Sequence, residues 1–163
     1  GNYPDFPEII EDGETYEDNA KIKAFAVFQK FNAPVIADDS GLGVEQLDGR
    51  PGVFSARYAG ENCTYDDNNN LLLKELENYS IPHQASFFCC SVYYDGTNFL
   101  TAMGELKGEI IKEKSGVNGF GYDPVFKPEG YNKTLAELPL EEKNKISHRG
   151  KSFRELKSKI KKL

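Results

Sequence analysis

The chain has 163 residues, of which 39% are hydrophobic and 28% are charged, a balance typical of one soluble domain with a buried core. Its net charge of −6 argues against a polynucleotide-binding surface, and no apolar run approaches the roughly 20 residues that a membrane-spanning helix needs. The three cysteines show no metal-ligand spacing, and the opening residues show no signal-peptide pattern, so we expect a reduced, cytoplasmic protein.

The first predicted element is a helix that begins after Thr15 and ends at about Phe31. Thr15 is followed three residues later by an acid, as in a capping box. Glu17 falls in the first turn, where a carboxylate suits the helix dipole, so its simplest role is to stabilise the helix start. Apolar residues at helical spacing predict one buried stripe, made of Ala20, Ala24, Val27, Phe28 and Phe31.

A short buried strand is predicted next, because residues 33–37 are apolar and stop at the turn-forming run Asp38-Asp39-Ser40-Gly41. Open α/β sheets bind ligands at the carboxyl ends of their strands. Neighbouring side chains on a strand point apart, so one aspartate is expected to face a cleft and the other to hold the turn. Gly41 would permit a sharp bend or a close approach to a ligand. The alternative is an ordinary Asx-turn that only ends the strand.

The middle of the chain alternates between loops and regular elements. Residues 48–62 form a long glycine-rich loop around Arg57, and loops of this length are usually functional. A second capping box at Thr64 predicts a helix that continues to about Tyr79. Residues 85–94, 99–106 and 108–114 are predicted as an antiparallel meander of three strands, with a turn at Asp95-Gly96. Short helical pieces at 135–138 and 141–146 and a final helix complete one domain without repeats or linkers.

Two further segments carry polar and aromatic groups on loops. The glycine-rich run 116–124 contains Phe120, Tyr122 and Asp123, and the two aromatics either face a ligand or belong to the core. Residues 147–150, Ser-His-Arg-Gly, either cap the last helix or present hydrogen-bond donors to an acceptor-rich ligand.

These features together predict a metal-assisted site for an anionic ligand with an aromatic ring. Carboxylates at a strand end suit Mg²⁺, which needs few protein oxygens and completes its shell with water and phosphate. An aromatic side chain on a glycine loop can stack on a base. The candidates are Glu17, Asp38, Asp39, Ser40, Phe120, Tyr122, Asp123, Lys143, His148 and Arg149.

Three long blocks carry most of the polar, glycine and aromatic residues named above. They are TYEDNAKIKA (15–24), ADDSGLGVEQLDGRPGVFSARYAG (37–60) and GVNGFGYDPVFKPEGYNKTLAELPLEEKNKISHRG (116–150). These blocks resemble the inosine triphosphate pyrophosphatase family, whose members hydrolyse non-canonical purine nucleoside triphosphates with magnesium. The resemblance implies a single α/β domain with a long twisted mixed sheet, flanking helices and two lobes around a cleft. It also implies a homodimer.

The resemblance assigns roles to individual residues. Asp39 is the expected proton acceptor and a Mg²⁺ ligand, and Glu17 is the second ligand. Both acids are expected to converge beside a purine slot walled by Phe120 and Arg149. Arginine only donates hydrogen bonds, which favours a 6-keto purine and hence ITP, dITP and XTP over ATP. The expected substrate-binding residues are Ser40, Phe120, Gly121, Tyr122, Asp123, Lys143, His148 and Arg149.

One departure from the family concerns its opening strand and phosphate-binding loop of Ser/Thr-x-Asn-x-x-Lys type. Residues 1–5 match neither, so roughly 35–40 residues are missing by comparison, about one βαβ unit. A missing strand would expose a sheet edge that dimerisation could cover. The alternatives to an active pyrophosphatase are therefore a catalytically weak nucleotide-binding fragment and a structural dimerisation module.

Overall fold

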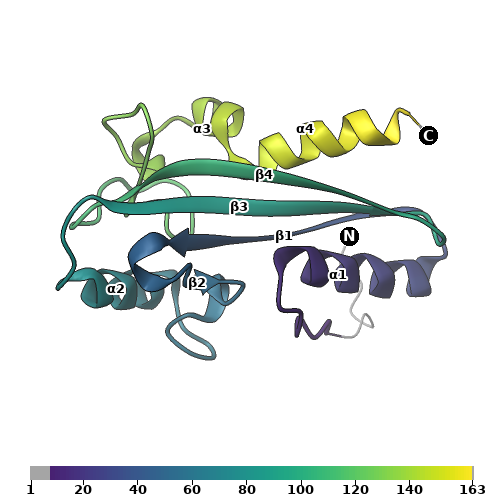
Figure 1. Cartoon of the computed structure of the whole chain (residues 1–163), viewed down its shortest axis with the longest axis horizontal. Helices are drawn as coiled ribbons and strands as arrows, with labels where there is room; N and C mark the ends of the chain where they lie inside the picture. Colours follow the sequence, from purple (N-terminus) through teal and green to yellow (C-terminus); the bar gives the residue numbers. More distant parts are fainter. Residues whose placement is uncertain (1–7, 163) are drawn as a thin grey trace.

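The computed structural model describes residues 8–162, so the expectations for residues 1–5 lie outside the described part. One five-stranded sheet is flanked by helices, which confirms the α/β class (Figure 1). The strand order is β2-β1-β3-β4-β5, and all four pairings are antiparallel, where a mixed sheet was expected. The elements are α1 (Tyr16–Phe31), β1 (Val35–Val44), η1 (Glu45–Leu47), β2 (Pro51–Gly52), η2 (Ser55–Arg57), α2 (Tyr65–Leu76), β3 (His83–Tyr94), β4 (Phe99–Ile110), β5 (Phe126–Pro128), η3 (Leu135–Glu137), α3 (Leu140–Ile146) and α4 (His148–Ile160).

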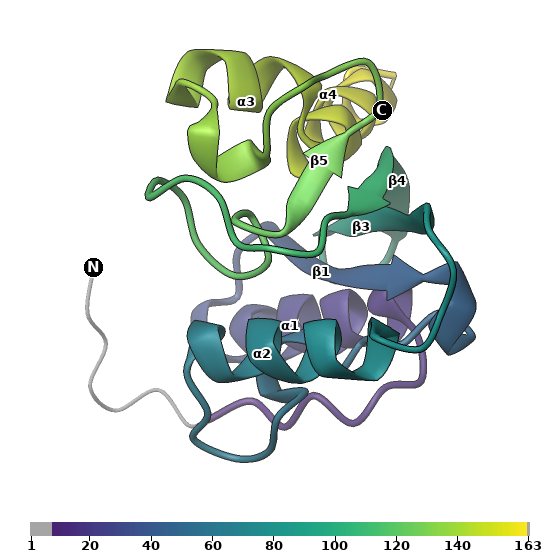
Figure 2. The same ribbon diagram turned by 90° about the vertical axis from the view of Figure 1, so that its left-hand side faces the viewer.

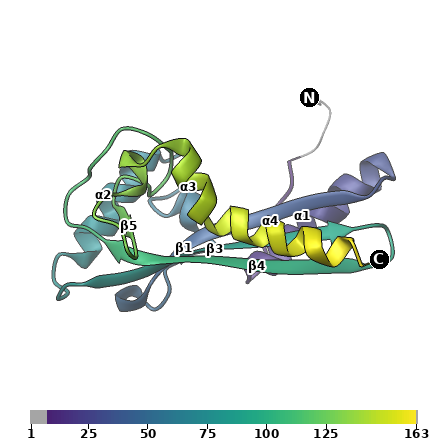
Figure 3. The same cartoon turned by 90° about the horizontal axis from the view of Figure 1, so that it is seen from above.

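α1 and α4 cover opposite faces of the sheet, and Figure 2 shows α1 beneath the strands and α4 above them. Ala20 and Ala24 of α1 pack with Cys90 and Val92 of β3, whereas Ser152 of α4 hydrogen-bonds to Ser91 on the other face. Leu72 and Leu76 of α2 belong to the same core as Leu42 and Phe87, so α2 lies on the α4 side. Seen from above, α2, α3 and β5 gather at one end of the sheet, whereas α1 and the end of α4 lie toward the other (Figure 3). Within residues 8–162, no helix has the length and apolar character needed to cross a bilayer.

β1 differs most from its prediction, because it does not end at the aspartates. It runs through Asp38 and Asp39 to Val44 and pairs with β3 over all ten residues. The continuous ladder of backbone hydrogen bonds to β3 overrides the local turn preference of Asp-Asp-Ser-Gly. The Asx-turn alternative is therefore wrong. Gly41 permits close packing of the backbone, because a Cβ there would overlap the carbonyl oxygen of Gly52.

The hairpin of β3 and β4 is confirmed, and Asp95 closes its turn by accepting hydrogen bonds from the backbone of Thr97 and Asn98. The predicted third strand at 108–114 is wrong. Gly108 lies inside β4, where a side chain would overlap Lys127 of the neighbouring strand, so glycine allows β5 to take the edge position instead.

The helix predictions hold in their main points. Thr15 caps α1 by accepting a hydrogen bond from the backbone of Asp18, and α1 ends at Phe31 as expected. Ala20 and Ala24 are fully buried, whereas Phe31 at the end of the stripe is exposed. The capping box of α2 is confirmed, but this helix ends at Leu76 rather than Tyr79.

The start of α4 is pressed directly onto the sheet. Buried Ser152 accepts a hydrogen bond from Ser91 N at 3.0 Å and donates one to Ala102 O at 2.8 Å, which ties α4 to β3 and β4. Gly104 of β4 lies under the same turn, and a Cβ there would overlap the carbonyl oxygen of His148. The position of His148 is therefore fixed by backbone packing as well as by hydrogen bonds.

Candidate functional site

The two aspartates of β1 lie on opposite faces of the sheet. Asp39 faces α1, is only 8% exposed, and accepts a hydrogen bond from Lys23 Nζ at 2.6 Å. Asp38 faces α4, where its Oδ2 accepts a hydrogen bond from Arg149 Nε at 2.9 Å. The prediction that these neighbours point apart is confirmed, but neither of them holds a turn.

Asp39 belongs to a small charged cluster. Lys23 Nζ also donates a hydrogen bond to Glu11 Oε2 at 3.1 Å, so one ammonium group joins two carboxylates. Burial raises the pKa of Asp39, the charge and hydrogen bond of Lys23 lower it, and Glu11 raises it again, with a net upward shift. A carboxylate with a raised pKa is a more effective proton acceptor near neutral pH.

Glu17, the expected partner of Asp39 in metal binding, forms an ion pair with Lys21 instead. Its Oε1 lies 2.6 Å from Lys21 Nζ, one turn along the exposed side of α1. Glu17 and Asp39 nevertheless lie on the same side of the sheet, because Glu17 belongs to α1 and Lys23 of the same helix contacts Asp39.

Lys23 and Glu11 were missed by the sequence analysis. Lys23 lies one helical turn after Asn19, and Asn19 is buried. A polar pair at this spacing beside an apolar stripe could have indicated that Lys23 also faces the sheet. Glu11 precedes α1 in a stretch without periodicity, so nothing in its local sequence indicated this contact.

The acid cluster suits a hard divalent cation. Asp39 and Glu11 already share one cationic group, so their oxygens converge on a common point. Among residues 8–162, no three His, Cys, Asp or Glu side chains gather closely enough to hold a metal ion unaided. Mg²⁺ tolerates this because water and phosphate oxygens usually complete its shell.

On the opposite face, Asp123 organises the glycine-rich loop. Its Oδ2 accepts a hydrogen bond from Phe120 N at 2.8 Å and forms an ion pair with Lys143. The ammonium of Lys143 lies 4.7 Å from the centre of the Phe120 ring. Phe120 is 58% exposed, so it is available for stacking and is not a core residue, whereas Tyr122 is buried and donates its hydroxyl to Ser55 O.

The same loop is held from α2 by a residue that the sequence analysis also missed. Gly121 adopts a left-handed conformation with φ 61°, and its carbonyl accepts a hydrogen bond from Asn69 Nδ2 at 3.0 Å. Asn69 is buried, and its Oδ1 has no hydrogen-bond partner among the described residues. The polar run Asn68-Asn69-Asn70 inside a helix was the signal, because buried amides need partners.

His148 and Arg149 open α4 next to this loop. The ring of His148 stacks on Phe87 with centroids 4.9 Å apart, and Ser147 caps the helix by accepting a hydrogen bond from Gly150 N. Burial, and then the charges of Arg149 and Lys143, lower the pKa of His148 to about 4, so this ring is neutral at pH 7. Its Nδ1 is buried without a hydrogen-bond partner in the described part of the chain.

We expected the acids to lie directly beside the purine slot. Instead, β1 lies between Asp39 with its charged partners on one face and Arg149 with the Phe120 loop on the other. Ser40 lies on the α4 face, because its hydroxyl donates to Asp38 at 3.3 Å. β2 pairs with β1 only at Leu42 and Gly43, and no other described strand covers the outer edge of residues 35–41.

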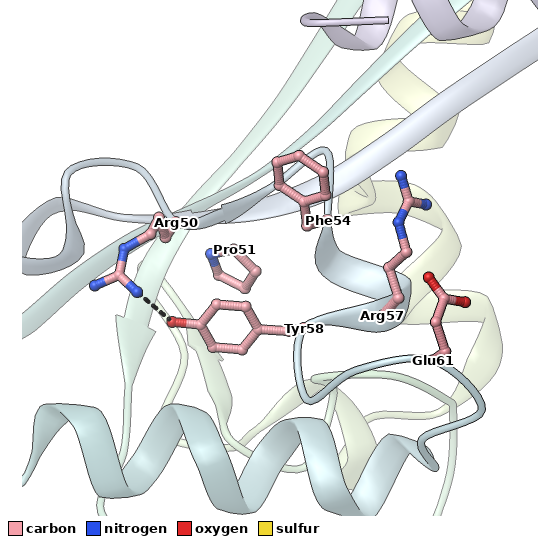
Figure 4. A pocket seen from close by; sticks show the side chains of 6 residues that line it. All are labelled: Arg50, Pro51, Phe54, Arg57, Tyr58 and Glu61. Atoms are coloured by element: carbon pink, nitrogen blue, oxygen red, sulfur yellow. Dashed lines mark hydrogen bonds between the residues drawn. The ribbon is translucent and has the colours of Figure 1, made fainter. Parts of the chain in front are cut away.

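The predicted functional loop after β1 lines cavities next to the acid cluster. One cavity has a volume of about 420 Å³. Figure 4 shows the side chains that line it, which are Arg50, Pro51, Phe54, Arg57, Tyr58 and Glu61. A neighbouring cavity of about 870 Å³ shares Phe54, Arg57 and Glu61 and is also lined by residues 8–14. Arg57 Nη2 donates to the carbonyl of Glu11 at 3.3 Å, so the larger cavity reaches the acid cluster. Its volume lies in the range of small-molecule sites.

Comparisons with known proteins extend over nearly the whole chain. The model of the Ham1 family matches residues 1–159. The dITP/XTP pyrophosphatase of Geobacter sulfurreducens is 47% identical over 158 residues, which cover 96% of this chain and 79% of that protein. The dITP/XTP pyrophosphatase of Caldanaerobacter subterraneus is 50% identical over 155 residues, covering 94% and 78%.

Solved structures agree with these matches. The Ham1 protein of Staphylococcus aureus superposes with a TM-score of 0.90 at 42% identity, covering 97% of this chain and 82% of that one. A HAM1 protein from Coxiella burnetii gives a TM-score of 0.91 at 40% identity with the same coverage. The resemblance inferred from the sequence is confirmed, and the chain belongs to the Ham1 family.

Proposed function

We propose that this chain hydrolyses non-canonical purine nucleoside triphosphates, such as ITP, dITP and XTP, to the monophosphate and pyrophosphate. The observation that carries the proposal is the buried Asp39 carboxylate, which Lys23 holds together with Glu11, on a strand whose opposite face contacts Arg149 through Asp38. The names of relatives that are 47–50% identical support the same substrate class.

Asp39 is the proposed proton acceptor. The oxygen of a water molecule forms a bond to the α-phosphorus, and the bond from that phosphorus to the oxygen bridging to the β-phosphate breaks, so pyrophosphate leaves. The proton released by the water passes to the Asp39 carboxylate. Its raised pKa, which burial causes, suits this role better than that of a solvated aspartate.

Asp39 and Glu17 are the proposed Mg²⁺ ligands, and Glu11 is a further acid that shares the Lys23 ammonium group with Asp39. When bound, Mg²⁺ would neutralise phosphate charge and polarise the α-phosphate. Lys23 would supply a further positive charge on this side of β1.

The purine is proposed to bind on the α4 side. Phe120 stacks on the ring, the Lys143–Asp123 pair holds the loop, and Arg149 donates to the 6-keto oxygen. Arginine carries only donors, so a 6-amino purine, which offers no acceptor at that position, would be disfavoured. The remaining proposed contacts come from Ser40, Gly121, Tyr122 and His148.

The proposal includes a homodimer in the cytoplasm. The support for a dimer is the resemblance to the inosine triphosphate pyrophosphatase family. Light scattering behind a sizing column would measure the oligomeric state directly, and a monomer at micromolar concentration would contradict the dimer.

The decisive experiment measures pyrophosphate release from ITP, XTP, dITP, ATP and GTP with Mg²⁺ and again after chelation. We expect turnover of the first three substrates, its loss on chelation, and its loss in Asp39→Asn. Asp66→Asn is the matched control, because Asp66 pairs with Lys114 on the surface. Turnover of ATP without turnover of ITP would contradict the proposal, and binding of inosine monophosphate without turnover would instead indicate a catalytically weak nucleotide-binding protein.

A further inference from the structure

We propose that Asp38 is a positioning residue that orients the Arg149 guanidinium toward the purine and thereby sets the preference for a 6-keto over a 6-amino base. This inference rests on the proposed function. Asp38 itself need not touch the substrate, because its carboxylate acts through Arg149.

The contacts of Asp38 converge on one oxygen. Arg149 Nε donates to Oδ2 at 2.9 Å, and Arg149 Nη2 lies 2.9 Å from the same oxygen. The Ser40 hydroxyl approaches it at 3.3 Å and the Cys89 thiol at 3.5 Å. These two donors hold the carboxylate in one orientation, so Oδ2 is a fixed point for the guanidinium.

Both ends of this pair are anchored by rigid elements. The backbone of Asp38 pairs with Ser91 in the centre of the β1–β3 ladder. The first turn of α4 is fixed by the hydrogen bonds of Ser152 and by the close contact at Gly104. The mobile part is the long side chain of Arg149, which is 52% exposed. The ion pair with Asp38 therefore restricts the rotamers of the Arg149 side chain, the part of this region that the backbone does not fix.

The geometry also selects which donors remain for a ligand. A guanidinium carries five N–H groups and no acceptor. Asp38 occupies the Nε side, so the Nη1 side is left for the substrate. A 6-keto oxygen accepts from these donors, whereas a 6-amino group cannot, and a freely rotating arginine would lose this directional requirement.

Asp38 and Asp39 should therefore differ in their effects on function. Asp39 faces Lys23 and acts on the reacting phosphate, so its loss should lower kcat. Asp38 faces Arg149 and acts on the base, so its loss should weaken binding of inosine nucleotides and leave kcat with saturating ITP largely unchanged.

The test is a double-mutant cycle with wild type, Asp38→Ala, Arg149→Ala and the double variant. Calorimetry gives the dissociation constants of inosine and adenosine monophosphates, and steady-state kinetics gives KM and kcat for ITP and ATP. We expect Asp38→Ala to weaken inosine monophosphate binding by about 10- to 100-fold, the effect of losing a charge-assisted hydrogen bond. Adenosine monophosphate binding should change by less than about threefold, and Asp38→Ala should add little in the Arg149→Ala background.

Two further variants keep the test decisive. Asp38→Asn retains the shape and one acceptor oxygen, so it replaces Asp38→Ala if the alanine variant does not fold, and it should show a smaller effect in the same direction. Glu155→Gln is the control, because it breaks a surface ion pair with Lys159 on the same helix, away from the site.

An unchanged ratio of inosine to adenosine affinity in Asp38→Ala and Asp38→Asn would overturn the inference, as would additive effects of Asp38→Ala and Arg149→Ala. If wild type hydrolyses ITP but the ratio stays constant, only the role of Asp38 fails. If wild type neither binds inosine monophosphate nor hydrolyses ITP, the proposed function fails, and the inference fails with it.

Discussion

The ammonium group of Lys23 lies 2.6 Å from the Asp39 carboxylate and also hydrogen-bonds to Glu11. The two partners act on Asp39 in opposite directions, since Lys23 lowers the pKa of Asp39 and Glu11 raises it. The pKa of Asp39 should therefore rise when Lys23 is removed and fall when Glu11 is removed.

The first prediction concerns the pH dependence of kcat/KM for ITP, whose acidic limb reports the pKa of the base in the free enzyme. Lys23→Met removes a group that lowers the pKa of Asp39, so the limb should move to higher pH. Glu11→Gln removes a group that raises this pKa, so the limb should move to lower pH. Lys159→Met on α4 is the control. Shifts of both variants in one direction would exclude Asp39 as the titrating base.

A second prediction concerns stability and His148. Burial holds the pKa of its ring at about 4, below the usual 6.5, so the unfolded state binds the proton more readily. The free energy of unfolding is therefore unaffected by protonation of this ring above pH 6.5. It falls as the pH drops from 6.5 toward 4, by about 3 kcal/mol at most. His148→Phe keeps a ring against Phe87 and removes the titration. Urea unfolding at about pH 7.5 and about pH 4.5 should therefore show a smaller loss in the variant. An equal loss of unfolding free energy in wild type and His148→Phe would show that His148 is not buried in its neutral form.

Gly104→Ala is expected to displace the start of α4, because the new methyl group would overlap the carbonyl of His148 and lie 2.6 Å from Ser152 N. Overpacking of this kind costs about 1–3 kcal/mol, and KM for ITP should rise as Arg149 moves with the helix. Thermal unfolding and kinetics measure both effects. Gly43→Ala is the control, since its Cβ would lie 3.3 Å from its nearest neighbours. An unchanged KM would show that the packing at Gly104 does not position Arg149 for substrate binding.

Asn69→Leu is expected to raise KM for ITP by about 3- to 10-fold, because Gly121 loses its hydrogen bond and the Phe120 loop loses its anchor on α2. Stability should change by less than about 1 kcal/mol, since leucine also removes the buried Oδ1, which has no hydrogen-bond partner among residues 8–162. Kinetics and urea unfolding test this together. Asn70→Ala, on the exposed side of the same turn, should leave KM unchanged. A large loss of stability without a KM effect would make Asn69 a purely structural residue.

Local signals in the sequence were sufficient for the elements that local chemistry determines. The caps at Thr15 and Thr64 and the Asp95-Gly96 turn were predicted correctly, because side chains within a few residues satisfy the backbone there. The loop residues Phe120 and Asp123 and the start of α4 were likewise identified from glycine-rich and capping patterns.

The remaining features depend on contacts between distant segments. β1 continues past Asp39 because β3, some 50 residues later, supplies its hydrogen-bond partners, and no local pattern reports this. The Lys23–Glu11 contact and the Asn69–Gly121 bond have the same origin. The separation of Asp39 from Arg149 by β1 follows only once the strand is known to continue through both aspartates.

The continuation of β1 through Asp38 and Asp39 restricts how the length of this segment can vary. Because facing alternates with every residue, one added or deleted residue between Val35 and Asp38 would exchange the two carboxylates, presenting the wrong acid to Lys23 and to Arg149. A change of two residues would restore the parity but displace both acids along β3. This stretch can therefore tolerate changes of residue type far more readily than changes of length.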